Sequence, residues 1–205
     1  TGSPWRDLPA FFGKWNTVFK RYRDWVKADV FMRLFEACSD EPDMEYAMID
    51  ATIVKAIATA KAQKGDQSQA IGRSKGGLTT KILALTDALG NLVRFVLLPG
   101  HRFDTIGVPP LIDGLSFSAL IADTAFDSNA IIADLDERGA KVVIAQHHRR
   151  TRKLMIDTEI YKWRHLIENF FCKLKEFKRI AMRADKTDTS FNAMIHLAAA
   201  VINSR

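Results

Sequence analysis

The stretch YKWRHLIENFFCKLK, residues 161–175, has the pattern of a helix with two opposite faces. Its polar face comprises Tyr161, Arg164, Glu168 and Lys175. At roughly 100° per residue these positions fall within an arc of about 60°. Its apolar face comprises Leu166, Ile167, Phe170, Phe171 and Leu174. We therefore expect one amphipathic helix whose apolar face packs into a core and whose polar face carries a single acid among cations.

This helix alone leaves two interpretations open. In the first, it is an ordinary amphipathic helix in which Glu168 pairs with neighbouring cations, for a few tenths of a kcal/mol. In the second, Glu168 acts together with acids elsewhere in the chain. The second interpretation requires such partners, because one carboxylate neither holds a divalent metal ion firmly nor catalyses phosphate chemistry unaided.

Length and composition indicate a globular protein with one main domain. Of its 205 residues, 47% are hydrophobic and 26% are charged, which is enough to bury a substantial core. No apolar run approaches the ~20 residues that span a bilayer, and the first residues lack the pattern of a signal peptide, so we expect a cytoplasmic protein. Cys38 and Cys172 are expected to be small buried hydrophobic residues rather than disulfide partners.

Positive charge is concentrated in one part of the chain. The formal net charge is +6, and residues 146–186 contain 12 Lys or Arg against 5 Asp or Glu, a local +7 that leaves −1 for the rest. Such a segment suits a polyanion, through contacts to phosphates and release of counterions. The alternative is a solvated face that keeps the protein soluble.

Hydrophobic periodicity and turn residues divide the chain into helices and strands. Strands are predicted at residues 46–54, 78–85, 92–98, 118–123 and 141–145, and the first is expected to pair with the next two. Helices are predicted within residues 5–38, near 106–114, at 128–138 and at 190–203. Residues 39–43 are a turn-rich boundary, and residues 61–77 and 147–153 are polar or basic loops.

Two acids stand out because of their places in strands. Asp50 interrupts the first apolar strand, and Asp123 ends the fourth. If these strands lie side by side and Glu168 faces them, three carboxylates converge. Two carboxylates about 4 Å apart repel by roughly 4 kcal/mol at an effective dielectric of about 20, so the cluster requires cations. Mg²⁺ is the expected cation, because it prefers oxygen ligands and binds carboxylates together with substrate phosphates.

Other polar residues have simpler explanations. Asp87 is interpreted as a turn residue, Asp104 as a cap, and Asp127 as a cap or a group that supports the metal ligands. His147 and His148 are expected to be solvated. The sequence contains no His/Cys zinc spacing, no Gly-rich phosphate loop ending in Gly-Lys-Ser/Thr, and no Gly-x-Ser-x-Gly elbow.

The pattern Tyr161-x2-Arg164-x3-Glu168-x6-Lys175 matches the signature of bacterial insertion-sequence transposases of the DDE type. The chain resembles their IS-five family nearly from end to end. Supporting stretches are WRDLP (5–9), MIDAT (48–52), GRSKGGLTTK (72–81), IAD (121–123) and RHLIENFF (164–171). The resemblance implies a ribonuclease-H-like α/β domain in residues 44–205, with a mixed sheet flanked by helices. It also implies that residues 1–40 are a short helical region, the truncated remainder of a DNA-recognition part.

The resemblance also implies roles for single residues. The implied metal ligands are Asp50, Asp123 and Glu168, and the implied phosphate contacts are Tyr161, Arg164 and Lys175. The implied cofactor is Mg²⁺, as two ions for which Mn²⁺ can substitute. The implied reaction is cleavage of double-stranded DNA at terminal inverted repeats and strand transfer into target DNA by in-line phosphoryl transfer. A homodimer on DNA, associated with the bacterial nucleoid, would carry it out.

The chain departs from the family pattern at Thr124, where the family usually has a Lys directly after the second acid. The leading hypothesis is an Mg²⁺-dependent DNA transposase. One alternative is an inactive DNA-binding relic or repressor derived from a transposase. A second alternative is a nuclease of the same fold that cuts DNA but does not join it.

Overall fold

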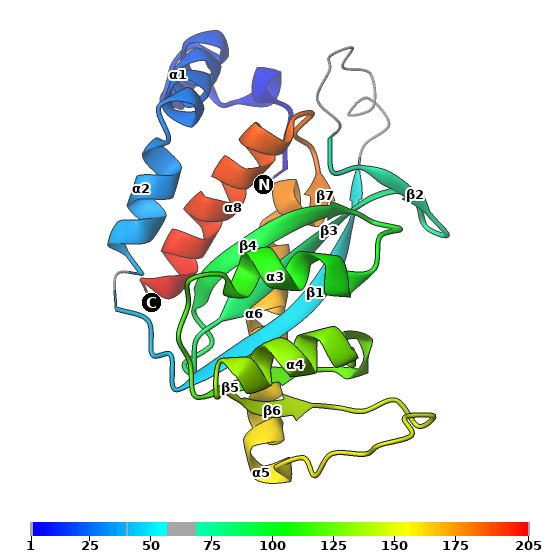
Figure 1. Cartoon of the computed structure of the whole chain (residues 1–205). Helices are drawn as coiled ribbons and strands as arrows, with labels where there is room; N and C mark the ends of the chain where they lie inside the picture. The colour runs from blue at the N-terminus through cyan, green and yellow to red at the C-terminus, as the bar shows by residue number, and fades with distance from the viewer. Residues whose placement is uncertain (1, 40, 57–68, 205) are drawn as a thin grey trace.

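The computed structural model describes residues 2–39, 41–56 and 69–204. A mixed sheet lies at its centre, with helices on both faces (Figure 1). Its strands are β1 (Tyr46–Ala56), β2 (Gly72–Ser74), β3 (Gly77–Thr86), β4 (Leu92–Pro99), β5 (Ala119–Ala122), β6 (Lys141–Ile144) and β7 (Met182–Arg183). The α-helices in these ranges are α1 (Trp15–Lys27), α2 (Val30–Ala37), α3 (Val108–Ile112), α4 (Asn129–Glu137), α5 (Thr158–Tyr161), α6 (His165–Glu176), α7 (Lys178–Ala181) and α8 (Asp188–Asn203). Short 3-10 turns are η1 (Trp5–Asp7), η2 (Ala10–Phe12), η4 (Asp104–Gly107), η5 (Thr124–Phe126) and η6 (Lys162–Arg164).

Strand β1 occupies the middle of the sheet. One of its edges pairs with β3 in antiparallel orientation, and the other pairs in parallel with β5 and, at its end, with β7. Beyond β3 lie β2 and β4, both antiparallel to it, and beyond β5 lies the parallel strand β6. The mixed sheet flanked by helices that the sequence led us to expect is thereby confirmed. The strands predicted from the sequence are all found, with ends that agree within two residues.

Three strand, loop and cysteine predictions need correction. β1 pairs with β3 but not with β4, because β4 occupies the other edge of β3. Part of the predicted loop 61–77 is strand β2, which pairs with β3, while its residues up to 68 lie outside the described residues. Cys172 is exposed and Cys38 half-buried, so the prediction that both are buried is wrong for Cys172.

The periodicity of residues 161–175 predicted one regular α-helix. This prediction is wrong, because the segment is divided into three parts. Tyr161 ends α5, residues Lys162–Arg164 form the 3-10 turn η6, and only then does α6 begin. A 3-10 turn has about 3.0 residues per turn instead of 3.6, so the angular spacing assumed from the sequence does not hold across it. Glu168 and Lys175 still share α6, whereas Arg164 and Tyr161 reach the same region from the preceding turns.

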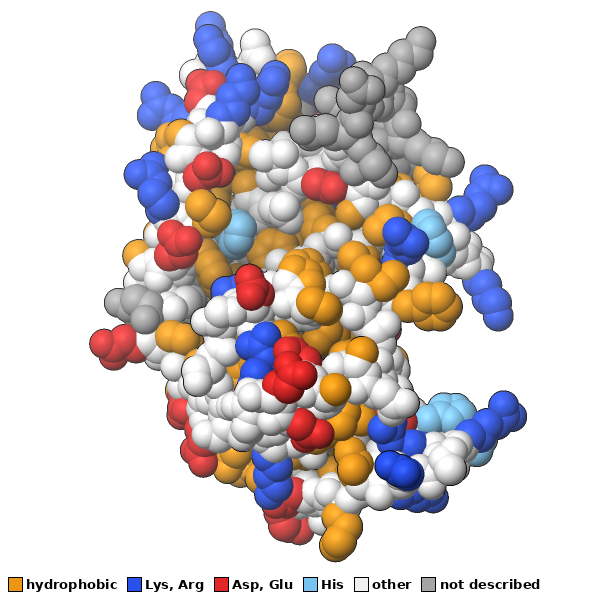
Figure 2. Space-filling view, in the orientation of Figure 1, with side chains coloured by type: hydrophobic (Ala, Val, Ile, Leu, Met, Phe, Trp, Pro, Cys, Tyr) orange, Lys and Arg blue, Asp and Glu red, His pale blue; other side chains and the backbone are white. Residues whose placement is uncertain are grey.

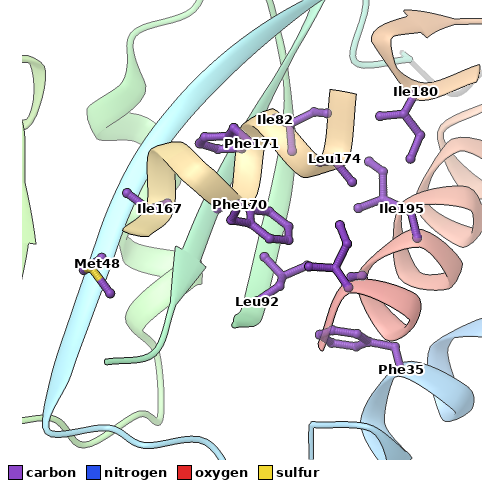
Figure 3. Close-up of a cluster of buried hydrophobic side chains, with 14 of the residues drawn as sticks. Phe35, Met48, Ile82, Leu92, Ile167, Phe170, Phe171, Leu174, Ile180 and Ile195 are labelled. Atoms are coloured by element: carbon purple, nitrogen blue, oxygen red, sulfur yellow. The ribbon is translucent and has the colours of Figure 1, made fainter. Parts of the chain in front are cut away.

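Each face of the sheet is covered by its own hydrophobic core. On one face, α6 and α8 pack against β1, β3 and β4, with Phe170 and Leu174 of α6 near Ile195 of α8 (Figure 3). On the other face, α3 and α4 cover a second core that includes Leu111 and Leu135. The apolar face of 166–174 predicted from the sequence is indeed directed into the first core.

The N-terminal helices α1 and α2 pack against α8. Tyr22 of α1 is buried and donates its hydroxyl hydrogen to the carbonyl oxygen of Ser190, at 2.9 Å. Phe31 of α2 joins Tyr22 and Ala193 in a third, smaller cluster. Among the described residues, no helix combines the length and apolar character that a membrane span requires.

A fully buried arginine links β7, β3 and the start of α8. The Arg183 guanidinium donates to Thr80 Oγ1 at 2.8 Å, to Asp188 Oδ1 at 2.6 Å and to the Ala70 carbonyl at 3.3 Å. It also lies 4.9 Å from the centre of the Phe191 ring. A buried charge is tolerated only when it is paired and hydrogen-bonded, and this network supplies those partners.

We expect Arg183→Met to lower the free energy of unfolding by about 3 kcal/mol, because it leaves Asp188 Oδ1 and Thr80 Oγ1 without this donor. Urea denaturation followed by circular dichroism measures this change. Arg73→Met, at an exposed position in β2, is the matched control and should shift the free energy by no more than about 0.5 kcal/mol. Equal effects of the two substitutions would contradict a stabilising role for the Arg183 network.

Candidate active site

Alternation along β1 decides on which face of the sheet Asp50 lies. Met48 belongs to the core beneath α6 and α8, whereas Ile49 belongs to the core on the opposite face. Side chains alternate between the two faces of a strand, so Asp50 lies on the same face as Met48, toward α6. Its side chain is 17% exposed, at the border of the apolar core.

The parallel register of β1 and β5 brings Asp123 level with Asp50. Ile49 is paired with Ala122, so Asp50 and Asp123 are the next residues on two adjacent strands. Ile121 belongs to the core beneath α6, and continuing the alternation by one pair places Asp123 on that face as well. Neighbouring strands are about 4.8 Å apart, which brings the two carboxylates within electrostatic range.

Glu168 approaches the same place from α6. Its neighbours Ile167, Phe170 and Phe171 are buried against the sheet and fix how the helix is rotated. Glu168 lies in the first turn of α6, and its side chain remains 49% exposed. The helix therefore presents a carboxylate to solvent at the edge of the core formed with β1.

Arg164 joins two of the three acids directly. Its Nη1 atom lies 3.2 Å from Asp50 Oδ2, and its Nη2 atom donates to Glu168 Oε1. Burial by itself would lower the pKa of Arg164, but the charges of Glu168, Asp50 and other nearby groups outweigh burial and raise it. One guanidinium thus holds together carboxylates from the sheet and from α6.

Backbone donors hold the two aspartates as well. Asp50 Oδ1 accepts a hydrogen bond from the amide of Ala51 at 2.7 Å. Asp123 Oδ1 accepts one from the amide of Ala125 at 2.8 Å and caps the turn η5. Each aspartate is therefore fixed through one oxygen by the main chain.

The pKa of Asp50 is raised above its ordinary value. Burial is the largest cause, and the charges of Asp123 and Glu168 act in the same direction. The Ala51 amide and Arg164 oppose this increase without cancelling it. Asp123 and Glu168 are thus close enough to Asp50 to influence it, and the single guanidinium of Arg164 leaves the three-acid cluster with excess negative charge.

The implied phosphate contacts do not all lie at this cluster. Tyr161 is half-buried against the first core and lies close enough to Arg164 to interact with it electrostatically. Lys175 is exposed, about two turns beyond Glu168 on α6, and makes no hydrogen bond or ion pair in the part of the chain that the structure describes. The structure therefore brings together Asp50, Asp123, Glu168, Arg164 and Tyr161, with Lys175 farther along the helix.

The donor set can be tested against the expected metal ion. Its side-chain ligands would be carboxylate oxygens, which suit Mg²⁺ or Mn²⁺. Within the described ranges, however, no group of three or more His, Cys, Asp and Glu is arranged to hold a metal ion. Arg164 already lies between Asp50 and Glu168. The ligand chemistry therefore fits, provided that Arg164 gives way.

The structure assigns clear positions to the remaining polar residues. Asp87 accepts hydrogen bonds within its turn, and Asp104 forms an ion pair with Lys81, so neither belongs to the cluster. His147 and His148 are exposed, as expected. The sequence indicated Asp127 only as a cap or supporting group, and its ion pair with Arg150 was missed. No sequence signal identifies that pair, because its members lie 23 positions apart.

The side chains of Asp50 and Asp127 are both largely shielded from water near this end of the sheet. Replacing each by Asn should change the Tm in opposite directions. The raised pKa of Asp50 means that the folded protein holds this proton more tightly than the unfolded chain. Stability therefore falls as pH rises from below the ordinary pKa through the raised one, and ionised Asp50 destabilises the fold at neutral pH. We expect Asp50→Asn to raise the Tm in EDTA at neutral pH.

Asp127→Asn should instead lower the Tm, because the Asp127 side chain is 3% exposed and is ion-paired with Arg150. Breaking such a buried pair costs about 3 kcal/mol. Differential scanning fluorimetry compares the two variants under identical conditions. A lower Tm for Asp50→Asn would show that its pairing with Arg164 outweighs the effect of burial.

Comparison with known proteins adds evidence that is independent of this geometry. Residues 41–203 match the family model of the transposase DDE domain, and residues 1–35 match that of the putative transposase of the IS4/5 family. A putative transposase for insertion sequence element IS6501, from Brucella ovis, is 39% identical over 127 residues, which are 61% of this chain and 98% of that protein.

Two further matches cover smaller shares of their own chains. The insertion element IS402 uncharacterized 16.2 kDa protein, from Burkholderia cepacia, is 35% identical over 88 residues, 39% of this chain and 58% of that protein. A cryo-EM structure of the piggyBac transposase synaptic complex with hairpin DNA has a TM-score of 0.48 at 12% identity. The match covers 83% of this chain and 48% of that chain. The family resemblance inferred from the sequence is confirmed by the family models, and the chain belongs to the DDE transposase family of insertion sequences.

Proposed function

We propose that this chain is a metal-dependent DNA transposase. It would cleave double-stranded DNA at the terminal inverted repeats of its insertion sequence and transfer the cut strand into target DNA. The observation that carries the proposal is the proximity of Asp50 to Asp123 and Glu168, from two adjacent strands and a helix, with Arg164 bridging Asp50 and Glu168. Membership of the DDE transposase family supports the type of reaction.

The three acids would be the metal ligands. We propose that Asp50, Asp123 and Glu168 hold two Mg²⁺ ions, for which Mn²⁺ can substitute. When bound, such ions activate the attacking oxygen and stabilise the leaving oxygen during in-line displacement at phosphorus. The protein would hold three carboxylates at one place despite their mutual repulsion. The hydrophobic core between β1 and α6 makes this possible, because it holds the strand and the helix together.

Arg164 would act in two states of the site. Without another cation, its two nitrogens neutralise Asp50 and Glu168 and keep them together. With cations held by the carboxylates, the guanidinium would be free, and its planar fork would match two phosphate oxygens. Tyr161 would support the same phosphate group, and Lys175 would contact a phosphate farther along the DNA as a point charge.

DNA would be engaged outside the cluster as well. The proposed partners are the terminal inverted repeats and the target DNA, with two copies of the chain acting as a homodimer because two ends must be cut. Residues 1–40 would contribute to recognition. Exposed cations on α1 support this assignment, namely Lys20, Arg21, Arg23 and Lys27.

The proposal is tested with a DNA duplex taken from the sequence that flanks the gene, incubated with and without Mg²⁺. We expect a metal-dependent strand break at the repeat boundary. Asp50→Asn, Asp123→Asn and Glu168→Gln should each abolish the break and leave duplex binding intact, because each removes one ligand without removing a cation. Glu176→Gln is the control, since it neutralises an exposed acid of α6 remote from the site.

The outcomes separate the competing functions. Cleavage that persists in one of the three variants would remove that residue from the site. Binding without a break by the unsubstituted protein would favour an inactive DNA-binding relic. Metal-dependent nicks without any joined product would identify a nuclease that cuts but does not transfer strands.

Lys175 can be tested separately through the salt dependence of binding. Each phosphate contact contributes about 0.9 to the slope of log affinity against log salt concentration. We expect Lys175→Gln to make this slope shallower by about that amount. Lys173→Gln, two residues earlier on α6 and lining a pocket with Ile202 of α8, is the matched control and should leave the slope unchanged. Equal slopes for both variants would remove Lys175 from the interface.

A further inference from the structure

The segment between β6 and α5, which the sequence predicted only as a basic loop, has a defined fold. We call residues 146–154 the arginine loop. Gln146 closes its neck with two hydrogen bonds to Leu154, through Nε2 to the carbonyl at 2.7 Å and through Oε1 from the amide at 2.8 Å. Inside the loop, the Arg150 amide donates to the His147 carbonyl at 2.9 Å, and the Arg149 amide donates to His147 Nδ1 at 3.2 Å.

One of the loop's four cations is directed inward and acts as an anchor. The Arg150 guanidinium donates to Asp127 Oδ1, to Asn129 Oδ1 at 2.7 Å and to the Arg152 carbonyl at 3.0 Å. Asp127 Oδ2 also accepts from the His147 amide at 2.8 Å. The side chains of this pair are 3% exposed at Asp127 and 15% exposed at Arg150, so the anchor is largely shielded from water.

The other three cations point into solvent. Arg149, Arg152 and Lys153 are exposed, and none has an ion-pair partner among the residues that the structure describes. Residues 146–156 contain no acid. Figure 2 shows Lys, Arg and His side chains gathered at the tip of the projection that corresponds in Figure 1 to the loop after β6. The anchor thus fixes the shape of the loop while leaving three charges free.

The loop begins beside the candidate active site. The amide of Ala145 donates to the carbonyl of Ala122 at 3.1 Å, one residue before Asp123. The anchor residue Asp127 follows Asp123 by four positions, across the turn η5. The arginine loop is therefore tied to the same end of β5 that carries the second acid of the cluster.

We propose that the arginine loop is a preformed clamp for the phosphate backbone of duplex DNA next to the site of cleavage. Arg149 and Arg152 contact phosphates, and Asp127 with Arg150 are positioning residues that hold the loop in its binding shape. The inference rests on the proposed transposase function for its choice of partner. Charge complementarity supports that choice, because duplex DNA carries one negative charge per roughly 1.7 Å of its length.

The arginine loop differs from a flexible basic tail because its conformation is fixed before DNA binds. A flexible segment must lose conformational freedom when it binds, which weakens its affinity. The hydrogen bonds of Gln146, His147 and Arg150 fix the loop before DNA arrives. Loss of the anchor should therefore weaken DNA binding even though it removes no cation from the loop.

The first experiment removes positive charges from the arginine loop to count its contacts with DNA phosphates. A fluorescent duplex of about 30 base pairs, of arbitrary sequence, is titrated in EDTA between about 50 and 200 mM salt. We expect Arg149→Gln/Arg152→Gln to make the salt slope shallower by about 2, corresponding to two phosphate contacts. The control Arg102→Gln/Lys173→Gln removes equal charge from exposed positions in the loop after β4 and on α6 and should leave the slope unchanged. Equal slopes for the two double variants would overturn the proposal.

The second experiment tests the anchor. Asp127→Asn makes the protein one unit more positive, so charge alone predicts tighter DNA binding. We expect weaker binding, together with faster trypsin cleavage after Arg149 and Arg152, because the loop loses its fixed shape. Asp134→Asn adds the same charge at an exposed ion pair on α4 and serves as the control. Tighter binding by Asp127→Asn than by Asp134→Asn, in protein that circular dichroism shows to be folded, would refute the positioning role.

The two proposals can fail independently. Binding in EDTA reports on the arginine loop without any cleavage, whereas the metal-dependent break reports on the three acids. Unchanged binding by Arg149→Gln/Arg152→Gln in a protein that still cuts DNA would refute the clamp alone. The opposite result is also informative. If DNA protects Arg149 and Arg152 from trypsin but the protein never cuts DNA, the clamp is supported and the proposed transposase activity is refuted.

Discussion

The parallel pairing of β1 with β5 is the constraint on which the candidate site depends. The register that sets Ile49 beside Ala122 makes Asp50 and Asp123 neighbours on adjacent strands. A shift of one residue would turn one carboxylate to the opposite face of the sheet, because side chains alternate along a strand. The two hydrophobic cores hold this register, since each strand buries apolar side chains on both faces. The site is therefore specified by packing that itself has no catalytic role.

Charge compensation is the second theme of the structure. Apolar surroundings raise the pKa of Asp50, and neighbouring acids raise it further, so the cluster favours any cation that can reach it. Arg164 supplies that cation from within the chain, in the place that we propose for the metal ions. Four positions after Asp123, the shielded Asp127 is paired in a similar way with Arg150. At this end of the sheet, Arg164 and Arg150 thus compensate acids, whereas Arg149 and Arg152 remain exposed to solvent.

Much of the fold could be predicted from periodicity, turn residues and the position of acids within apolar runs. The strands, the helix 128–138 and the final helix were found close to their predicted ends, because each has a clear local pattern. The errors came from features that local pattern does not encode. A strand has only two edges, and which partners occupy them depends on the whole sheet, so the pairing of β1 with β4 was wrongly expected. The 3-10 turn at Lys162–Arg164 lies inside a helical pattern and leaves no mark in it.

Spacing and residue type are local properties, and they were enough to identify the family, the mixed α/β class and the residues from which a site could be built. It indicated Asp50, Asp123 and Glu168 as partners, and family membership is confirmed. Three features became visible only in the folded chain: Arg164 bridges two of these acids, Lys175 lies apart from them, and Arg150 is turned inward to Asp127. Such contacts join residues that are far apart in the chain. They depend on strand register and helix rotation, which the burial of whole core faces decides.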